Sequence, residues 1–271
     1  MDTRPIGVFD SGLGGLTVVK KLREVLPHED IVYFGDTGRV PYGTKGRETI
    51  LRYARQDMQL LLNHDVKLIV AACGTVSSFV TEELTRRLPV PFLSVLAPAA
   101  QKAAALSSTG RIGVLGTSAT VHSKSYGKAI RGIRADAVVL GKACPMFVPL
   151  AENGYIHGHP MALPFAQEYL ESLKKEDLDV VILGCTHYPL LFETIRQVLG
   201  DSCHYVDTGA EAALAAQAYL TLHSLRKESE EPGRMTLMVS DLTDSFADTA
   251  ALFLGEPVEE KEIQIVSADA L

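Results

Sequence analysis

The chain has 271 residues, 46% of them hydrophobic, and a formal net charge of −7 at pH 7. This length and hydrophobic content are enough for two modest α/β domains, each with a full core. The negative net charge disfavours general nucleic-acid binding, which needs a basic surface, but it permits a small anionic substrate held by backbone N–H groups and hydroxyls.

The cysteine pattern and the first residues indicate a reduced, cytoplasmic protein. Four cysteines occur and none belongs to a C-x-x-C pair, which disfavours zinc knuckles and thioredoxin-type chemistry. The N-terminus runs directly into a predicted strand without a signal peptide, and no apolar run is long enough to span a bilayer. We therefore expect a cytoplasmic location and no membrane partner.

The first part of the chain alternates strands, turns and helices. Strands are predicted from short apolar, β-branched runs, and helices from apolar residues at helical spacing. The expected elements are, in chain order, a strand at 6–9, a glycine-rich turn at 10–15, a helix from residue 16 that Pro27 ends, a strand at 31–34 with an exit loop at 35–37, a helix at 47–63, and strands at 67–72 and 92–96.

The pattern restarts near residue 111. Residues 111–118 (RIGVLGTS) resemble residues 6–11 (IGVFDS), and each copy is followed at a similar distance by a strand that ends in a cysteine. Alternating strands and helices predict parallel sheets with helices on both faces. Ligands of such sheets bind beyond the carboxyl ends of the strands, where we expect Asp10, Asp36, Cys73, Thr117 and Cys185.

The C-terminal part is expected to return to the first sheet. An alanine-rich helix is predicted at 210–225, a solvated loop at 226–234, and strands at 235–239 and 262–266. We therefore predict a discontinuous domain one, residues 1–96 plus 210–271, and a domain two of residues 97–209. The predicted fold class is α/β, with two pseudo-symmetric halves and parallel sheets.

Two cysteines stand in nearly the same local sequence. Cys73 follows LIVAA and Cys185 follows VVILG, and both precede small hydroxylated residues that can open a helix. A thiol at such a turn lies near a positive helix end, which can lower its pKa from about 8.5. Two such thiols predict a racemisation in which one takes the α-proton of an amino acid and the other returns a proton to the opposite face. For Cys144 and Cys203 we keep the usual interpretation, a small buried hydrophobe.

Three side chains are candidates to assist these thiols. Asp10 follows a strand and precedes a glycine-rich turn, so it could orient a thiol or hold a substrate ammonium; capping of the next helix is an equally good alternative. His187 lies two residues after Cys185 and could tune that thiol. Glu152, in a loop after an apolar segment, is an ordinary surface acid on the sequence alone.

Hydroxyl groups and one loop could bind a dicarboxylate without arginine. The hydroxyl residues are Ser11, Thr75, Thr117, Thr120 and Thr186, each of which could instead cap a helix. The loop at 41–45 (PYGTK) could add backbone N–H groups or be a plain turn. His157 and His159 have no acidic or cysteine neighbours at ligand spacing, so we expect no metal. The glycines at 12, 14 and 15 do not complete G-x-G-x-x-G, which disfavours a dinucleotide.

The motifs resemble those of the glutamate racemases, within the cofactor-independent aspartate/glutamate racemase superfamily. The matching stretches are 7–17 (GVFDSGLGGLT), 35–37 (GDT), 41–45 (PYGTK) and 184–190 (GCTHYPL), and the similarity covers nearly the whole chain. It implies two flavodoxin-like domains with the active site in the cleft between them, and interconversion of L- and D-glutamate with no cofactor, neither pyridoxal phosphate nor metal. It also implies a bacterial enzyme that supplies D-glutamate for peptidoglycan, often as a homodimer.

The resemblance also implies roles for individual residues. Cys73 and Cys185 would act on opposite faces of Cα, Asp10 and His187 would assist them, and Glu152 would lie near the second thiol. The implied substrate-binding positions are Asp10, Ser11, Pro41, Tyr42, Gly43, Gly74, Thr75, Thr117, Thr120, Cys185, Thr186 and His187.

One position departs from the family's pattern. The first motif usually reads Cys-Asn-Thr, whereas this chain has Gly74 between Cys73 and Thr75. Glycine removes the amide donors, and a lost hydrogen bond to a charged group costs about 1.5–3 kcal/mol. We therefore expect Gly74→Asn to raise the turnover of glutamate. Two alternatives stay open: a racemase of another acidic amino acid such as aspartate, and a weakly active substrate-binding or regulatory relative.

Overall fold

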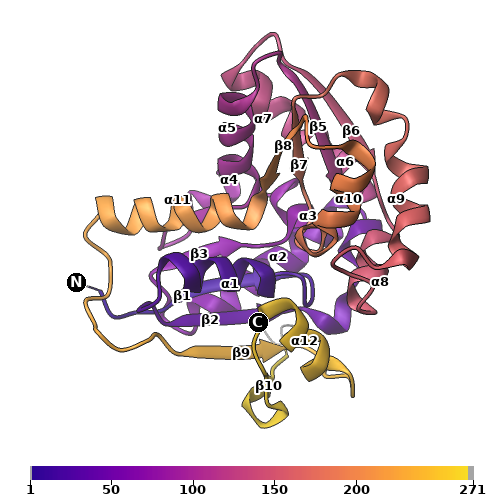
Figure 1. The fold of residues 1–271 in the computed structure, drawn as a ribbon. Coiled ribbons are helices and arrows are strands. Elements are labelled where there is room, and N and C mark those ends of the chain that lie inside the picture. Colours follow the sequence, from indigo (N-terminus) through magenta and orange to yellow (C-terminus); the bar gives the residue numbers. More distant parts are fainter. Residues whose placement is uncertain (1, 268–271) are drawn as a thin grey trace.

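The computed structural model describes residues 2–267 and contains two sheets whose strands pair in parallel (Figure 1). The first sheet has the strand order β10-β9-β2-β1-β3-β4, and the second has the order β6-β5-β7-β8. This confirms the predicted α/β class with parallel sheets. Within residues 2–267, no helix combines the length and the apolar character that a membrane crossing needs.

The strands and helices have the following bounds. The strands are β1 (Ile6–Asp10), β2 (Ile31–Gly35), β3 (Leu68–Ala71), β4 (Phe92–Ser94), β5 (Arg111–Gly116), β6 (Val138–Ala143), β7 (Val180–Leu183), β8 (His204–Asp207), β9 (Met235–Val239) and β10 (Ile263–Ile265). The helices are α1 (Leu16–Val25), α2 (Arg47–Leu62), α3 (Gly74–Ser77), α4 (Glu82–Thr85), α5 (Leu96–Leu106), α6 (Ser118–Ser123), α7 (Ser125–Ile133), α8 (Phe147–Glu152), α9 (Leu163–Leu170), α10 (Phe192–Leu199), α11 (Thr208–Leu222) and α12 (Phe246–Leu254).

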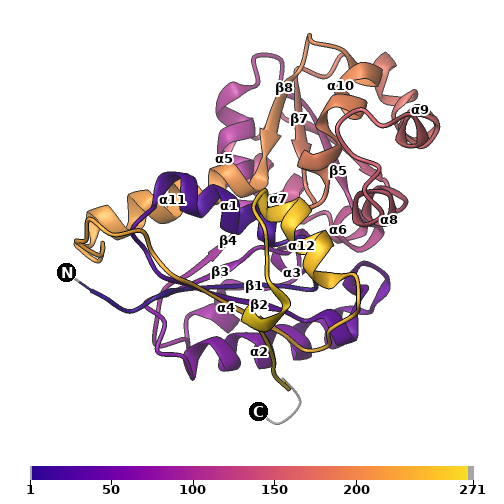
Figure 2. The ribbon, with the colours of Figure 1, turned by 60° about the horizontal axis from the view of Figure 1, so that its bottom comes forward.

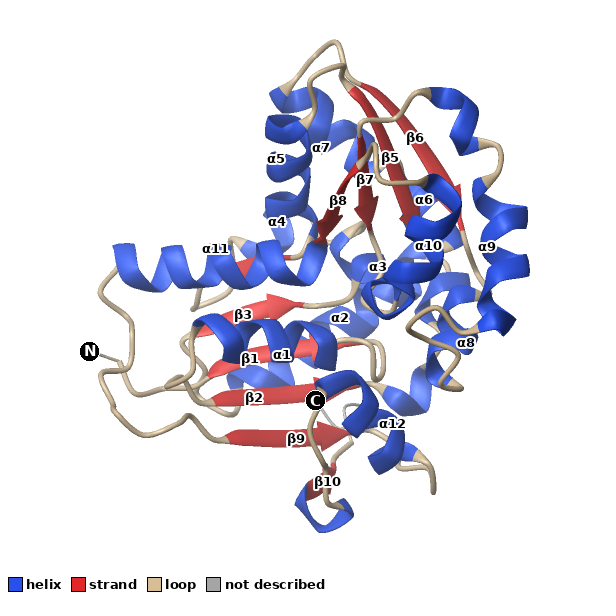
Figure 3. Ribbon diagram, viewed as in Figure 1, coloured by secondary structure: helices blue, strands red, loops and turns tan. Residues whose placement is uncertain are grey.

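The first sheet is covered on both faces, which explains its continuous apolar strands. All five residues of β1 are buried, because successive side chains point to opposite faces and each face carries helices. Val8 packs in a cluster with residues of α1, α11 and α12, whereas its neighbour Phe9 packs with residues of α2. The strands of this sheet run toward the second sheet (Figure 3).

The second sheet is built in the same way. Val114 and Ile182 pack with residues of α5 and α7 on one face. Leu115 and Val181 pack with residues of α8, α9 and α10 on the other face. The carboxyl ends of β5 and β7 point toward α3 and the first sheet, so the ends of both sheets meet (Figure 3).

Helix α11 joins the two halves. It packs against α1 of the first half and against α5 of the second, and Figure 2 shows it running past both. One hydrophobic cluster extends through it from the first sheet to the second. The strand ends that carry the candidate residues are thereby held against each other by a shared apolar core.

Most predicted elements are present, with differences at their ends and at one edge. The predicted strand at 92–96 stops at Ser94, because α5 already begins at Leu96. The edge strand β6 was not predicted, since its residues are half-exposed or exposed and carry a weak apolar signal. Strands β9 and β10 extend the first sheet beside β2. The limits of the two domains at residues 96 and 209 stay a prediction.

Candidate active site

A cavity of about 390 Å³ lies where the carboxyl ends of the two sheets meet, and both candidate thiols line it. The sheet register explains why: Asp10 and Gly35 are level at the end of β1 and β2, and Leu115 and Leu183 are level in β5 and β7. The residues lining it are Ser11, Gly12, Val40, Pro41, Tyr42, Gly43, Thr44, Cys73, Gly74, Thr75, Thr117, Ser118, Pro145, Val148, Pro149, Glu152, Cys185, Thr186 and His187.

Cys73 follows β3 and immediately precedes the short helix α3. Its Sγ donates to Ser11 Oγ at 3.5 Å, and the residue is 5% exposed. Burial and the nearby Asp10 carboxyl raise the pKa of the Cys73 thiol to about 12. The sequence-based expectation of a lowered pKa is therefore wrong for this thiol, since a helix of four residues offsets little of the desolvation. Cys73 is a neutral thiol at neutral pH.

Cys185 follows β7 and has a different neighbour. Its Sγ lies 3.7 Å from Nδ1 of His187, whose Nε2 lies 3.0 Å from Oε1 of Glu152 on α8. Burial lowers the pKa of His187, but the hydrogen bonds to Cys185 and Glu152 outweigh it and raise that pKa to about 10. These two contacts favour the imidazolium form of His187, which lies against Cys185. Glu152 joins this chain of contacts, although its side chain stays 41% exposed.

Asp10 lies behind the cavity wall. It is 1% exposed, its Oδ2 accepts the N–H of Gly12 at 3.0 Å, and its Oδ1 has no hydrogen-bond partner within the described residues. Burial raises the pKa of this carboxyl, while the charge of His187 opposes the shift. The N-cap of α1 is Gly15 without any side-chain cap, so the structure does not support capping by Asp10. A buried, half-satisfied carboxyl beside Cys73 favours the functional interpretation.

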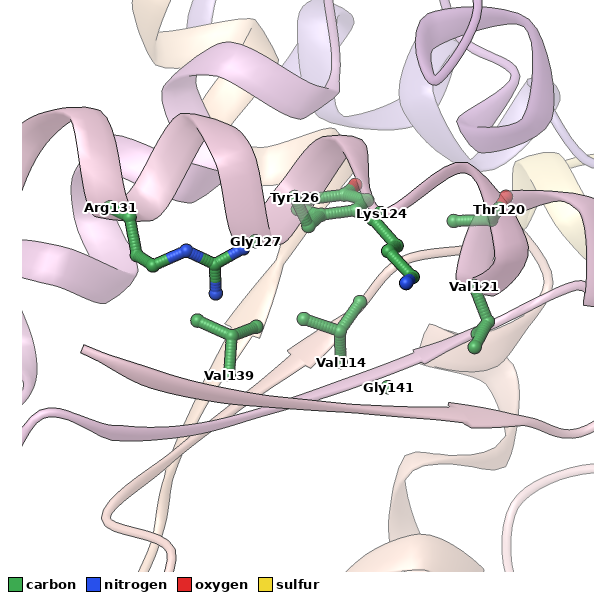
Figure 4. A pocket seen from close by; sticks show the side chains of 9 residues that line it. All are labelled: Val114, Thr120, Val121, Lys124, Tyr126, Gly127, Arg131, Val139 and Gly141. Atoms are coloured by element: carbon green, nitrogen blue, oxygen red, sulfur yellow. The ribbon is translucent and has the colours of Figure 1, made fainter.

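Three threonine hydroxyls form a line from one half to the other. Oγ1 of Thr75 lies 3.0 Å from Oγ1 of Thr117, which donates to Oγ1 of Thr120 at 3.0 Å. Thr75 and Thr117 line the cavity, whereas Thr120 lies behind Thr117 and lines a second cavity of about 270 Å³. Figure 4 shows that second cavity between helices α6–α7 and strands β5–β6. Thr120 therefore orients Thr117 from behind the wall, because its own hydroxyl is turned toward Thr117.

The loop that carries Pro41 and Tyr42 is held by a buried charged cluster. The Tyr42 hydroxyl donates to carboxylate oxygens of Asp36 and, at 3.2 Å, of Asp57. Arg39 donates to Asp36 at 2.6 Å and to Asp57 at 3.0 Å. Both carboxylates are fully buried, and burial with the neighbouring Asp36 raises the pKa of Asp57. The loop at 41–44 is thus anchored to the first half, while a Cβ on Gly43 would lie 3.0 Å from Thr117 of the second.

Several residues of this region were not found from the sequence. Asp57 reads as a polar position of the helix at 47–63, and nothing local signals its contact with Tyr42. Pro145, Val148 and Pro149 form an apolar part of the wall before and within α8, and their local sequence carries no motif. Tertiary packing alone brings these residues to the cavity.

The composition of the wall limits the chemistry. Among residues 2–267, no lysine or arginine lines the cavity, so carboxylates of a substrate would be held by hydroxyls, backbone N–H groups and the charge of His187. Within residues 2–267, no group of three or more His, Cys, Asp and Glu side chains is placed to hold a metal ion. Two thiols with separate acidic partners in one cavity suit proton transfer on two faces of a carbon.

Residues 6–216 match the Asp/Glu/hydantoin racemase family. The chain belongs to this family. The resemblance seen in the sequence motifs is thereby confirmed over most of the chain. A glutamate racemase from Chlorobaculum tepidum is 44% identical over 260 residues, which are 96% of this chain and 95% of that protein.

Solved structures of family members share the arrangement. The glutamate racemase of Francisella tularensis in complex with D-glutamate matches with a TM-score of 0.91 at 33% identity, over 100% of both chains. That of Thermus thermophilus in complex with β-chloro-D-alanine matches with a TM-score of 0.89 at 41% identity, again over 100% of both chains.

Proposed function

We propose that the protein is an amino-acid racemase, an isomerase that interconverts L- and D-glutamate without a cofactor, using Cys73 and Cys185 as the two bases. The observation that carries this proposal is that both thiols line one cavity between the two sheets. The named relatives and solved structures that are 33–44% identical are glutamate racemases, which supports glutamate as the substrate.

The reaction needs one thiolate and one thiol at the start. We assign removal of the α-proton to Cys185, which contacts the His187 imidazolium, and return of a proton to the opposite face of Cα to the neutral Cys73 thiol. After the product enantiomer has formed, Cys185 is a thiol and Cys73 is a thiolate. The reverse reaction starts from that state, and otherwise a solvent proton exchange restores the first one.

Other cavity residues hold the substrate in this proposal. Hydroxyl and N–H groups bind the carboxylates and stabilise the negative charge that builds up when the α-proton leaves. We assign this binding to Ser11, Tyr42, Gly43, Gly74, Thr75, Thr117, Cys185, Thr186 and His187, all of which line the cavity. Pro41 also lines the cavity, but it has no N–H to donate, so it contributes to the shape of the wall. Asp10 assists Cys73 and the substrate ammonium from behind the wall, and Glu152 assists Cys185 through His187.

Solvent deuterium exchange tests the proposal. The purified protein is incubated in D₂O with L-glutamate, D-glutamate or L-aspartate, and the Cα–H signal and the optical rotation are followed. We expect loss of the Cα–H signal together with inversion for both glutamate enantiomers, and a much slower reaction with aspartate. Faster inversion of aspartate would identify the other acidic substrate. Binding of glutamate without exchange would show a binding protein instead of a racemase.

We further propose a cytoplasmic homodimer that supplies D-glutamate for peptidoglycan. The family membership supports this setting, because D-glutamate is the product that such enzymes provide for the cell wall. Complementation of a D-glutamate-requiring bacterial strain tests the role, and light scattering of the purified protein tests the dimer. If the strain still needs D-glutamate although the folded protein is expressed, the role in peptidoglycan supply is contradicted. If light scattering gives the mass of a monomer, the homodimer is contradicted.

A further inference from the structure

A glycine stands where the two loops that carry the thiols meet. Gly74 opens α3 directly after Cys73, and it faces the carbonyl oxygen of Gly184, the residue before Cys185. A Cβ placed on Gly74 would lie 2.1 Å from that oxygen and 3.7 Å from the Cα of Cys185. Real Cβ atoms essentially never approach a heavy atom closer than 3.0 Å, so no side chain fits here unless a loop moves.

The Gly184 side of this contact cannot withdraw. Its N–H donates to the carbonyl oxygen of Leu115 at 2.7 Å, which ties it to the end of β5. A Cβ on Gly184 would itself lie 2.7 Å from that oxygen and 3.4 Å from the ring of Tyr126. The Gly184 backbone is therefore confined between Gly74 in front and β5 behind.

The Gly74 side is equally fixed. Its carbonyl oxygen accepts the N–H of Ser78 at 3.1 Å and the hydroxyl of Ser78 at 2.8 Å. The next residue, Thr75, contacts Thr117 of the second half through hydroxyls 3.0 Å apart. Two backbone segments thus touch between rigid elements, and an added side chain would force the two halves apart at this point.

We propose that Gly74 is a positioning residue that sets the separation of the two thiols by allowing the two backbones to touch. The proposal depends on the proposed two-thiol function. Each thiol is one residue from the contact, so moving the contact moves the thiols. An added Cβ would have to move from 2.1 Å to at least 3.0 Å from the Gly184 oxygen, which requires a shift of about 1 Å, and misplacement on that scale can cost about 100-fold in rate.

This contact contradicts the expectation that Gly74→Asn raises turnover. Asparagine brings amide donors, but it also brings a Cβ to a position that a backbone oxygen occupies. The departure from the family's Cys-Asn-Thr pattern is therefore matched by a close approach of Gly184 in this chain. Gly74 fits its surroundings here, and a larger residue does not.

The test compares Gly74→Ala and Gly74→Asn with a matched control, Gly132→Ala, whose added Cβ would meet nothing within 4 Å. We expect kcat to fall about 100-fold in both Gly74 variants for both glutamate enantiomers, and to stay unchanged in Gly132→Ala. Exchange of the α-proton with retention should rise relative to inversion in the Gly74 variants, because the second thiol no longer reaches the carbanion. A purely structural role would not change that ratio.

Two results would overturn the proposal: a Gly74→Ala rate within about threefold of the parent, or a Gly74→Asn rate above it. If the parent racemises glutamate and these results occur, the positioning role fails and the proposed function stands. If the parent itself does not racemise glutamate, the function fails first. A crystal structure gives a test that needs no variant: Gly74 Cα within about 3.6 Å of the Gly184 oxygen supports the contact, and a clear gap refutes it.

Discussion

The two halves of the cavity present their thiols from nearly the same local structure, yet in opposite electrostatic settings. Each thiol follows a buried parallel strand at the sheet end. Cys73 lies near the buried carboxyl of Asp10, and its pKa is raised to about 12, whereas Cys185 contacts the imidazolium of His187. A repeated scaffold thus fixes where the thiols are, while the charged groups beside the two thiols differ.

This difference has a use in a reversible reaction. Racemisation needs one base that is ready and one acid that is ready, so identical settings would leave both thiols in the same state at rest. The His187–Glu152 pair places a positive charge beside Cys185. The Asp10 carboxyl on the other side favours the protonated form of Cys73. Substitutions, alkylation and pH should therefore affect the two thiols differently.

Removal of either thiol should have the largest effect. We expect Cys73→Ser and Cys185→Ser each to lower racemisation by at least about 10³-fold, because each removes one of the two proton carriers. Cys203→Ser is the matched control, since Cys203 does not line the cavity, and it should keep the parent rate. Racemisation at the parent rate in either cavity variant would remove that cysteine from the mechanism.

Alkylation should distinguish the two thiols directly. Only thiolates react with iodoacetamide, and Cys73, with its pKa near 12, is almost entirely protonated at pH 7.5. We expect Cys185 to be modified at least about 100-fold faster than Cys73, as measured by mass spectrometry of the digested protein. The two residues are 7% and 5% exposed, so access alone would not produce that difference. Equal rates would refute the asymmetry.

The pH dependence should report His187. Its raised pKa means that the imidazolium is present below about pH 10 and is lost as the pH rises through that value. The high-pH limb of kcat/KM should therefore lie near pH 10 and move to lower pH in Glu152→Gln, with activity at pH 8 reduced about tenfold. Asp10→Asn is the comparison: it should reduce activity and move that limb less than Glu152→Gln does, because Asp10 acts on His187 through its charge alone, whereas Glu152 also accepts a hydrogen bond from it.

The smallest effect is expected at the loop anchor. Tyr42→Phe removes a donor from two buried carboxylates, so it should lower the free energy of unfolding by about 1.5–3 kcal/mol and raise KM several-fold more than it changes kcat. Tyr53→Phe is the matched control, because the ring of Tyr53 packs against that of Tyr42 at a tilt of 45°, but its hydroxyl makes no hydrogen bond within residues 2–267. Equal KM values for both variants would show that the Tyr42 hydroxyl does not influence substrate binding in the cavity.

The sequence predicts the scaffold and the thiols well, for a local reason. Runs such as LIVAA before Cys73 and VVILG before Cys185 are buried on both faces, and this leaves an unmistakable apolar signal. Parallel sheets then place strand ends together, which brings Thr75 to Thr117. The half-exposed edge strand β6 has no continuous apolar run and was therefore not predicted.

Contacts between distant segments could not be predicted. Glu152 reads as a surface acid until the fold brings it to His187, 35 residues further along the chain. Asp57 is only a polar helix residue until it meets Tyr42. The pKa of Cys73 rises because desolvation, which depends on the whole surrounding fold, exceeds the local influence of a short helix. Gly74 shows the same limit: its backbone contact exists only in the folded chain.

The shared apolar core has a thermodynamic consequence. A single cluster of buried side chains runs from Val8 beneath α1, through Ala213 and Ala216 of α11, to Val181 and Ile195 of the second half. Neither half can melt without exposing part of the surface that stabilises the other, so the chain should lose its structure cooperatively. Scanning calorimetry should accordingly record one heat-absorption peak, even though the backbone is arranged around two separate sheets.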